Sequence, residues 1–292
     1  MEISPLRAWI EAARPKTLPA SLSPVLVGTA LAYREGTFRL MPALLCLMVA
    51  LLAQIASNFA NDYFDFKKGA DKEDRLGPER AVASGWITPK AMLRGTFIAL
   101  GLACLSGCML LFYSGWELIP VGIAIALCVL AYSAGPFPLA YNGLGDVCVL
   151  LFYGIIPVVF TYYVQAGSFT LLAFILSVAM GLLSVNILIV NNYRDYFQDK
   201  AVKKRTSVVL FGRRFGRWLY LFNGIVPILL ILPLLLQCEA WKVALFGIFF
   251  VLFIQTWREL ISFEGKALND TLAHTGRNVL LFALCLSALL VF

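Results

Sequence analysis

Long apolar segments dominate this 292-residue sequence and restrict its fold more than any other feature. Sixty per cent of the residues are hydrophobic and only 14% are charged, whereas a soluble domain has about half and about a quarter. Because about 20 apolar residues cross the hydrocarbon core of a bilayer, such segments indicate a membrane protein. Nine spans are predicted, at residues 18–34, 42–64, 92–113, 117–134, 144–165, 169–192, 217–236, 241–257 and 277–292.

These spans are expected to be helices. Inside hydrocarbon the backbone N–H and C=O groups have no water partners, so only helices and closed barrels can cross. The segments are longer than barrel strands and lack their alternation of polar and apolar residues. The predicted fold is therefore all-α: one polytopic membrane domain over residues 1–292 with nine transmembrane helices.

The basic residues fall mostly on one side of this predicted topology. Only Arg34, Arg39 and Lys242, of 24 basic residues, lie outside the N-terminal segment and the loops on that side. The positive-inside rule explains this asymmetry, and it accounts for the net charge of +7 without nucleic acid as a partner. We therefore expect the N-terminus inside, the C-terminus outside and the basic side in the cytoplasm.

Two loops on the basic side carry similar acidic motifs, at residues 58–75 and 191–205. At an offset of 130, Asn61 aligns with Asn191, Asp65 with Asp195, and Arg75 with Arg205. The motifs are four predicted spans apart and so face the same side. This pattern predicts an internal pseudo-repeat whose two copies meet at one end of the protein.

The spacing within each motif suits a divalent cation. Asn61 and Asp65 are four residues apart, as are Asn191 and Asp195, and on a helix such pairs share one face. A carboxylate placed within the membrane costs roughly 2.5–3.5 kcal/mol, so several of them need compensation. Magnesium, which takes carboxylate, water and phosphate oxygens, is the predicted cofactor. The predicted ligands from this spacing are Asn61, Asp65, Asn191, Asp195 and Asp199.

Basic residues follow each acidic motif, and these suit a diphosphate. Guanidinium and ammonium groups bind phosphate oxygens that a metal leaves uncovered. The predicted diphosphate ligands are Lys68, Arg75, Arg80, Lys204 and Arg205. Acids, metal and bases together favour departure of an allylic diphosphate, and aromatic faces stabilise the cation left behind.

A solvated, salt-bridged surface explains either loop alone, but it does not explain a repeated Asn–Asp pair with a matched arginine. A transporter with duplicated halves is a further alternative, although its site normally lies near the membrane midplane rather than at helix ends. The lone histidine, His274, is expected in a polar loop before the last span.

The motifs resemble those of the UbiA superfamily of intramembrane aromatic prenyltransferases. The resemblance rests on NDYFDFKKGADKEDRLGP from Asn61 to Pro78, YSAGPFPLAYNGLGD from Tyr132 to Asp146 and ARPKTLP from Ala13 to Pro19. It implies nine helices around a central cavity. Many members carry a third aspartate where this chain has Gly69, and the resemblance suggests that Asp71 replaces it as a metal ligand.

Within the superfamily the chain is most similar to the branch that prenylates 1,4-dihydroxy-2-naphthoate in menaquinone biosynthesis. The implied reaction joins a polyprenyl diphosphate to this acceptor, releases diphosphate and CO₂, and gives demethylmenaquinone. The nearest alternative is another member of the superfamily that acts on 4-hydroxybenzoate, haem, chlorophyllide or a glycerol phosphate. The implied location is a bacterial cytoplasmic membrane, with membrane lipid around the protein.

The resemblance also assigns roles to individual residues. Asp65, Asp195 and Tyr132 are the predicted catalytic residues, with Tyr132 lining the aromatic pocket. Arg14 and Lys16 lie before the first span, where positive-inside anchoring explains them without a role in the site. Donor chain length and oligomeric state have no recognisable signal in the sequence.

Overall fold

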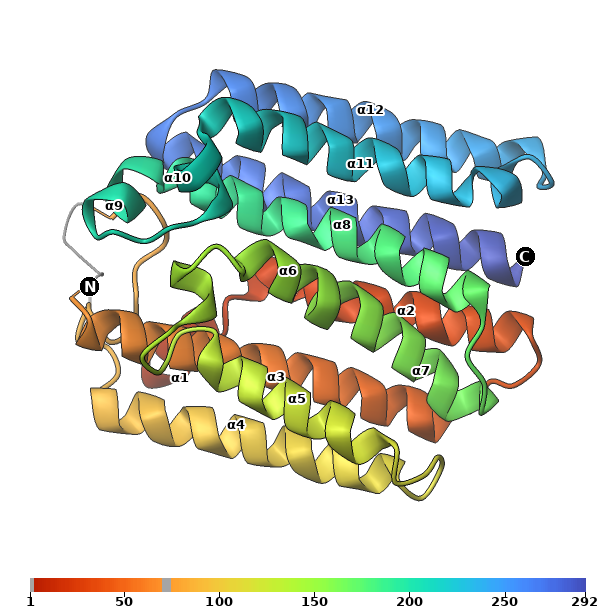
Figure 1. Ribbon diagram of the computed structural model, residues 1–292, viewed down its shortest axis with the longest axis horizontal. Coiled ribbons are helices and arrows are strands. Elements are labelled where there is room, and N and C mark those ends of the chain that lie inside the picture. Colours follow the sequence, from red (N-terminus) through yellow and green to blue (C-terminus); the bar gives the residue numbers. More distant parts are fainter. Residues whose placement is uncertain (1–2, 70–74) are drawn as a thin grey trace.

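Parallel and antiparallel helices form a single bundle in the computed structural model, which describes residues 3–69 and 75–292 (Figure 1). The α-helices are α1 (Pro5–Ala13), α2 (Pro19–Arg34), α3 (Leu40–Lys67), α4 (Pro89–Leu110), α5 (Leu118–Ala131), α6 (Gly145–Leu150), α7 (Ile156–Ala166), α8 (Leu171–Arg194), α9 (Tyr196–Ala201), α10 (Ser207–Phe211), α11 (Arg213–Leu235), α12 (Ala240–Ser262) and α13 (Leu268–Val291). Short 3₁₀ turns lie at Pro15–Thr17, Leu139–Tyr141 and Gly265–Ala267, and a π-helical turn at Leu151–Ile155 joins α6 to α7.

The predicted all-α membrane fold is confirmed, but the count of nine spans is not. Among the described residues, seven helical stretches are long and apolar enough to cross a membrane. All nine predicted segments lie on helices, but two of these are short. The helix α5 has 14 residues and α2 has 16, fewer than the roughly 20 that a perpendicular span needs.

The last helix begins much earlier than the hydropathy predicts. It starts at Leu268 rather than near 277, so the expected polar loop around His274 is wrong. His274 lies within α13, where its Nδ1 atom is 2.9 Å from a carboxylate oxygen of Glu259 on α12. The polar first two turns of α13, paired with α12 through His274, therefore replace the expected loop.

Helix ends follow local sequence signals. Thr88 and Thr170 cap α4 and α8 by accepting hydrogen bonds from the backbone N–H groups of Ala91 and Ala173, as N-cap residues do. The helix α3 ends at Lys67, and Gly69, just past its C-cap Lys68, has a φ of +67°, the left-handed conformation that glycine adopts most easily. An aspartate at this position would have to adopt the same strained conformation.

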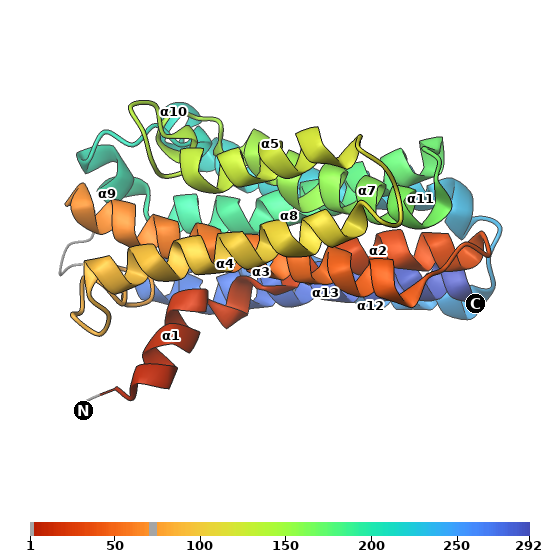
Figure 2. The same ribbon diagram turned by 90° about the horizontal axis from the view of Figure 1, so that it is seen from below.

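The helix α8 forms the centre of the bundle. Of its most apolar window, 72% is buried inside the protein, compared with 33% for α3. The helices α11 and α13 pack along it on one side, and α6 and α7 on the other (Figure 1). Seen from below, α1 projects from the bundle at the end where α3 finishes (Figure 2), and the C-terminus lies at the opposite end.

The α6–α7 stretch approaches α8 at two glycines. A Cβ atom added to Gly154 would lie 2.3 Å from the Cα atom of Gly181, inside van der Waals contact. Small residues allow membrane helices to pack backbone against backbone in this way. The contact brings the wide π-helical turn, and the tyrosine next to Gly154, against the central helix.

Replacement of Gly154 by alanine should therefore destabilise the protein. The added methyl group must push α8 away, and overpacking of this kind costs about 1–3 kcal/mol. The midpoint of thermal unfolding in detergent measures the effect.

Gly101→Ala is the matched control, because a Cβ atom there meets nothing within 4 Å. Its unfolding midpoint should equal or slightly exceed that of the wild type. Equal midpoints for Gly154→Ala and Gly101→Ala would contradict the close approach.

Candidate functional site

A cavity of about 730 Å³ runs between α2, α3, α4, α5, the α6–α7 stretch and α8. Along α3 its lining extends from Cys46 to Asp65, which at 1.5 Å per residue corresponds to about 28 Å. Apolar side chains such as Val25, Leu110 and Phe160 line one end, and the acidic motifs line the other. The cavity therefore has the depth of a membrane and one polar end.

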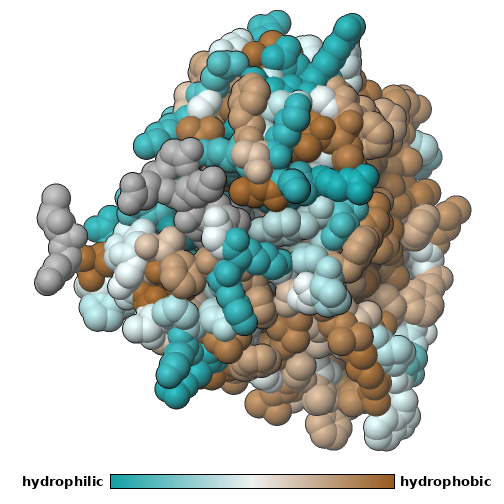
Figure 3. Space-filling view, turned by 60° about the vertical axis from the view of Figure 1, so that its left-hand side comes forward, coloured by the Kyte–Doolittle hydropathy of each residue, from teal (hydrophilic) through white to brown (hydrophobic). Residues whose placement is uncertain are grey.

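Polar residues also concentrate on the surface at that end. Hydrophilic residues gather over the end of the bundle, while hydrophobic residues cover the flank (Figure 3). This distribution is the one expected where a membrane protein emerges from the bilayer into water.

The first acidic motif occupies the last turns of α3. The Asn61 Oδ1 atom accepts hydrogen bonds from the guanidinium groups of Arg14, at 2.8 Å, and Arg80, at 2.6 Å. Arg80 also lies 3.4 Å from the Asp65 carboxylate, and both side chains are more than 90% buried. Asp65 accepts a further hydrogen bond from the Tyr141 hydroxyl at 2.9 Å. Buried charge of both signs thus converges at this helix end.

Asp62, although part of the same motif, faces away from the cavity. Its two carboxylate oxygens accept the backbone N–H groups of Ala81 and Val82 at 3.0 and 3.2 Å. The side chain is 1% exposed and does not line the cavity. Asp62 therefore fixes the segment that carries Arg80.

The second acidic motif begins at the end of α8. Arg194 donates two hydrogen bonds of 2.7 Å to the Asp195 carboxylate, and a third to the Asn269 side chain. The Lys204 ammonium is 3.3 Å from Asp199. The second Asp199 oxygen is buried and has no hydrogen-bond partner among the described residues.

The Tyr141 ring joins the two motifs. The ammonium groups of Lys68 and Lys204 lie 4.5 and 5.5 Å from its centre, and its backbone carbonyl accepts the Arg205 N–H at 2.9 Å. Lys68 also donates to the Ser133 carbonyl at 2.7 Å. One residue from the 132–146 segment thus contacts both halves of the predicted repeat.

The pKa values of two groups show how close these charges lie. Burial raises the pKa of Asp199; Lys204 opposes the rise, and the charges of Asp195 and Asp65 add to it. Burial likewise lowers the pKa of Lys68, with Asp65 opposing and Lys204 adding. Carboxylates from both motifs therefore interact electrostatically across the cavity end.

The donor set suits a metal that is shared with a ligand rather than held by protein alone. No three acidic, cysteine or histidine side chains in the described part of the chain form a ready metal site. Asp199 nevertheless aims an unpartnered buried oxygen here, and Asn191 lines the same cavity. Magnesium commonly uses one or two carboxylates together with phosphate oxygens and water, and these residues fit that pattern.

Most of the predicted site residues meet at this cavity. Its lining includes Asn61, Asp65, Arg75, Arg80, Tyr132, Asn191, Asp195, Asp199 and Lys204. Lys68 and Arg205 are exposed and outside the lining, although the Lys68 ammonium group contacts the lining residue Tyr141. Asp71 lies outside the described residues. The roles assigned to these residues stay predictions.

Sequence reasoning missed three residues of the site. Arg14, interpreted as a membrane anchor, lines the cavity and binds Asn61. Tyr141 and Arg194 lie within sequence motifs, but no role in the site was predicted for either residue. The adjacency of Arg194 and Asp195 was a usable signal, whereas the partners of Arg14 and Tyr141 lie 47 and 76 residues away in the chain.

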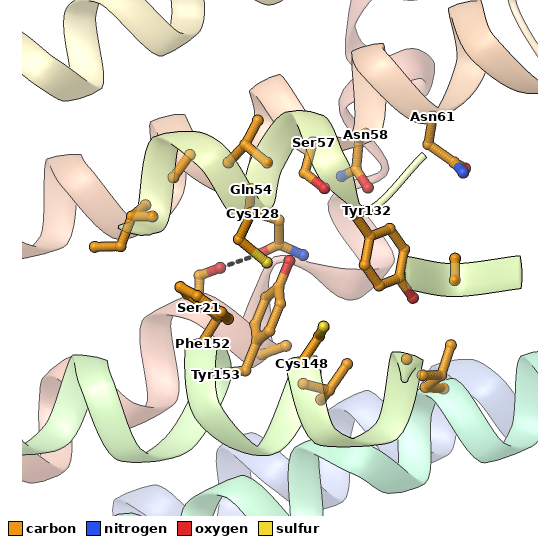
Figure 4. Close-up of a pocket in the computed structure, with 18 of the residues that line it drawn as sticks. Ser21, Gln54, Ser57, Asn58, Asn61, Cys128, Tyr132, Cys148, Phe152 and Tyr153 are labelled. Carbon is orange, nitrogen blue, oxygen red and sulfur yellow. Dashed lines mark hydrogen bonds between the residues drawn. The ribbon is translucent and has the colours of Figure 1, made fainter. Parts of the chain in front are cut away.

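A band of polar side chains crosses the cavity next to the acidic end (Figure 4). Gln54 accepts a hydrogen bond from Ser21 and donates to the Thr17 carbonyl at 2.8 Å. Tyr132 and Tyr153 extend into the same space from α5 and the π-helical turn (Figure 4). The cavity thus offers hydrogen-bonding groups and aromatic faces between its acidic and apolar ends.

Comparisons with known proteins agree with this architecture. Residues 21–275 match the UbiA prenyltransferase family. The 1,4-dihydroxy-2-naphthoate octaprenyltransferase of Escherichia coli (strain K12) is 42% identical over 217 residues, which cover 72% of this chain and 70% of the relative. The enzyme of the same name from Mycobacterium tuberculosis is 33% identical over 288 residues, 97% of each chain.

A solved structure supports the fold independently. A UbiA homolog from Archaeoglobus fulgidus, bound to DMAPP and Mg²⁺, superimposes with a TM-score of 0.68 at 16% identity. The match covers 97% of this chain and 98% of that one.

Removal of the Asp62 side chain should destabilise the protein. Asp62→Ala leaves the buried N–H groups of Ala81 and Val82 without acceptors, at about 1–3 kcal/mol for each. Thermal unfolding in detergent measures the loss. Glu79→Ala, which removes an exposed carboxylate from the same segment, should leave the midpoint unchanged. A wild-type midpoint for Asp62→Ala would show that Asp62 does not fix this segment.

Proposed function

This chain belongs to the UbiA prenyltransferase family, and from that premise we propose that it transfers a polyprenyl group from its diphosphate to 1,4-dihydroxy-2-naphthoate. Diphosphate and CO₂ leave, and the immediate product is the hydroquinone demethylmenaquinol, the two-electron-reduced form of the demethylmenaquinone of menaquinone biosynthesis. The observation that carries the proposal is the meeting of two acid-bearing helix ends at the polar end of a deep apolar cavity. The names of the relatives support the naphthoate acceptor.

The polar end is proposed to bind the diphosphate. Asn61, Asp65, Asn191, Asp195 and Asp199 would hold Mg²⁺ there, which when bound offsets the charge that develops on the leaving diphosphate. Arg75, Arg80 and Lys204 line the same end and can donate to phosphate oxygens. Arg80 pairs with Asp65 and Arg194 pairs with Asp195, and these contacts hold the two carboxylates in place until a substrate arrives.

The apolar end is proposed to hold the prenyl tail. Val25, Leu110, Leu118 and Val164 line it, so an aliphatic chain that leaves the lipid exchanges one apolar surrounding for another. The tail then places the C–O bond that breaks at the junction between the apolar and polar lining.

The aromatic acceptor is proposed to bind in the band around Gln54, Tyr132 and Tyr153. This band separates the diphosphate end from the tail, so the acceptor ring meets the allylic carbon as the C–O bond breaks. The diphosphate leaves with that electron pair, a ring carbon forms the new C–C bond, and loss of the carboxylate as CO₂ restores the aromatic ring. The faces of Tyr132 and Tyr153 can stabilise the cationic carbon.

We further propose that the polar end faces the cytoplasm of a bacterium. The basic residues that surround the site, such as Lys204 and Arg213, support this orientation through the positive-inside rule. A water-soluble acceptor and diphosphate product would then exchange directly with the cytoplasm. Transport, the alternative function, requires a passage to the other face of the membrane.

Replacement of either central carboxylate should abolish turnover. Asp65→Asn and Asp195→Asn keep side-chain size but remove a charged metal ligand, and such losses cost roughly 100-fold or more in rate. Product formation in membranes, measured by mass spectrometry, is the readout. An excess of EDTA should silence the wild type, and Mg²⁺ should restore it.

The matched control is Asp270→Asn, which removes an exposed carboxylate at the start of α13. It should keep wild-type activity. Retained activity in Asp65→Asn or Asp195→Asn, or turnover in excess chelator, would refute the metal-binding role.

An aromatic face at position 132 should matter more than its hydroxyl group. A desolvated cation–π contact contributes about 2 kcal/mol, so Tyr132→Leu should lower kcat about 30-fold. Tyr132→Phe should retain most of the wild-type kcat, which initial rates at saturating substrate concentrations measure. If Tyr132→Phe is as slow as Tyr132→Leu, the hydroxyl group rather than the ring acts in the reaction.

A further inference from the structure

A second hollow lies on the outer surface of the bundle, away from the central cavity. It has a volume of about 310 Å³ and is lined by Arg214, Arg217 and Trp218 from the start of α11 and by Trp257 and Ile261 from the end of α12. The prenyl-transfer reaction uses none of these residues. From them we propose that this hollow binds the headgroup phosphate of an anionic phospholipid.

Two guanidinium groups in the hollow are available for an anion. Arg214 is exposed and has neither a hydrogen bond nor an ion pair among the described residues. Arg217 donates its Nε–H to the Tyr193 hydroxyl at 2.7 Å, and within the described chain its terminal nitrogens make no hydrogen bond. Arg213 beside them differs, because Glu264 neutralises it at 3.2 Å. Two uncompensated arginines on adjacent turns suit a phosphate diester.

The two tryptophans fix the hollow at the depth of lipid headgroups. The rings of Trp218 and Trp257 are 6.3 Å apart, and the Trp257 indole N–H donates to the Arg217 carbonyl at 3.0 Å. Tryptophan is enriched at the membrane–water interface, and basic pockets between membrane helices at this level bind anionic headgroups.

An apolar face continues from the hollow toward the membrane interior. Trp218, Phe222, Ile225 and Leu229 recur every three or four residues on α11, and all are at least 36% exposed. Residues at this spacing share one side of a helix. Acyl chains can therefore pack along α11 while the phosphate meets the arginines, an arrangement that inorganic phosphate cannot exploit.

The proposed lipid site is physically connected to the helix end that carries Asp195. Arg217 contacts the buried Tyr193, and the neighbouring Arg194 holds the Asp195 carboxylate. A phosphate on Arg217 would therefore restrain the segment from Tyr193 to Asp195, and bound lipid should stabilise the folded protein.

Titration of the delipidated full-length protein in detergent, without substrates, tests the site. Brominated phosphatidylglycerol quenches nearby tryptophan fluorescence, and a saturable quench gives its Kd. Arg214→Gln removes one phosphate ligand without breaking an internal contact, and it should weaken binding about tenfold. Arg94→Gln is the control. It removes an exposed arginine near the start of α4, a helix that begins at the same end of the bundle as α11 (Figure 1), and this variant should bind the lipid like the wild type.

Each outcome decides for or against the site. Equal affinity of Arg214→Gln and the wild type for the lipid would overturn the proposal. An equal loss of lipid affinity in Arg214→Gln and Arg94→Gln would also overturn it, because general surface charge would then explain the binding. Equal binding of brominated phosphatidylcholine would remove the selectivity for anionic lipid. Inorganic phosphate that displaces the brominated lipid at equal concentration would show an anion site without a lipid requirement. Because no substrate is present, these results are independent of the proposed reaction.

Discussion

Positive charge held against buried carboxylates is the interaction on which the rest of this structure depends. An ionised group removed from water must be paired, and an unpaired one costs several kcal/mol. Three ion pairs provide this pairing: Arg80 with Asp65, Arg194 with Asp195, and Lys204 with Asp199. These pairs allow α3 and α8 to end with acids at the polar end of a largely apolar cavity. Without them both helix ends would bring carboxylates to the cavity without a positively charged partner.

The pairs come from different parts of the chain, and this explains how the site is assembled. Arg80 is placed by a loop that Asp62 fixes to α3, Arg194 belongs to α8 itself, and Lys204 follows the short helix α9. Tyr141 then connects the two acidic ends through its hydroxyl, ring and carbonyl. A segment between the two motifs, rather than direct contact between them, therefore sets their separation.

The helices could be predicted well from the sequence. Hydropathy marks the membrane segments, and the need to hydrogen-bond every backbone group inside hydrocarbon leaves few alternatives to a helix. Sequence reasoning failed at α13, where polar residues around His274 pair with α12 and so continue the helix instead of forming a loop. It predicted the carboxylates from their spacing, since helix periodicity is a local property. It could not find the roles of Arg14 and Tyr141, because these depend on tertiary contacts across many residues. Arg205 matched Arg75 by alignment, yet its side chain lies outside the cavity.

The orientation of Asp62 changes how the motif around it should be counted. Consecutive positions of a helix point in directions about 100° apart, so Asn61 and Asp62 serve different parts of the molecule. A tally of acidic letters in this stretch would therefore assign the cavity one carboxylate ligand too many. A polyanionic substrate and its metal meet fewer carboxylate oxygens there than the primary structure alone implies.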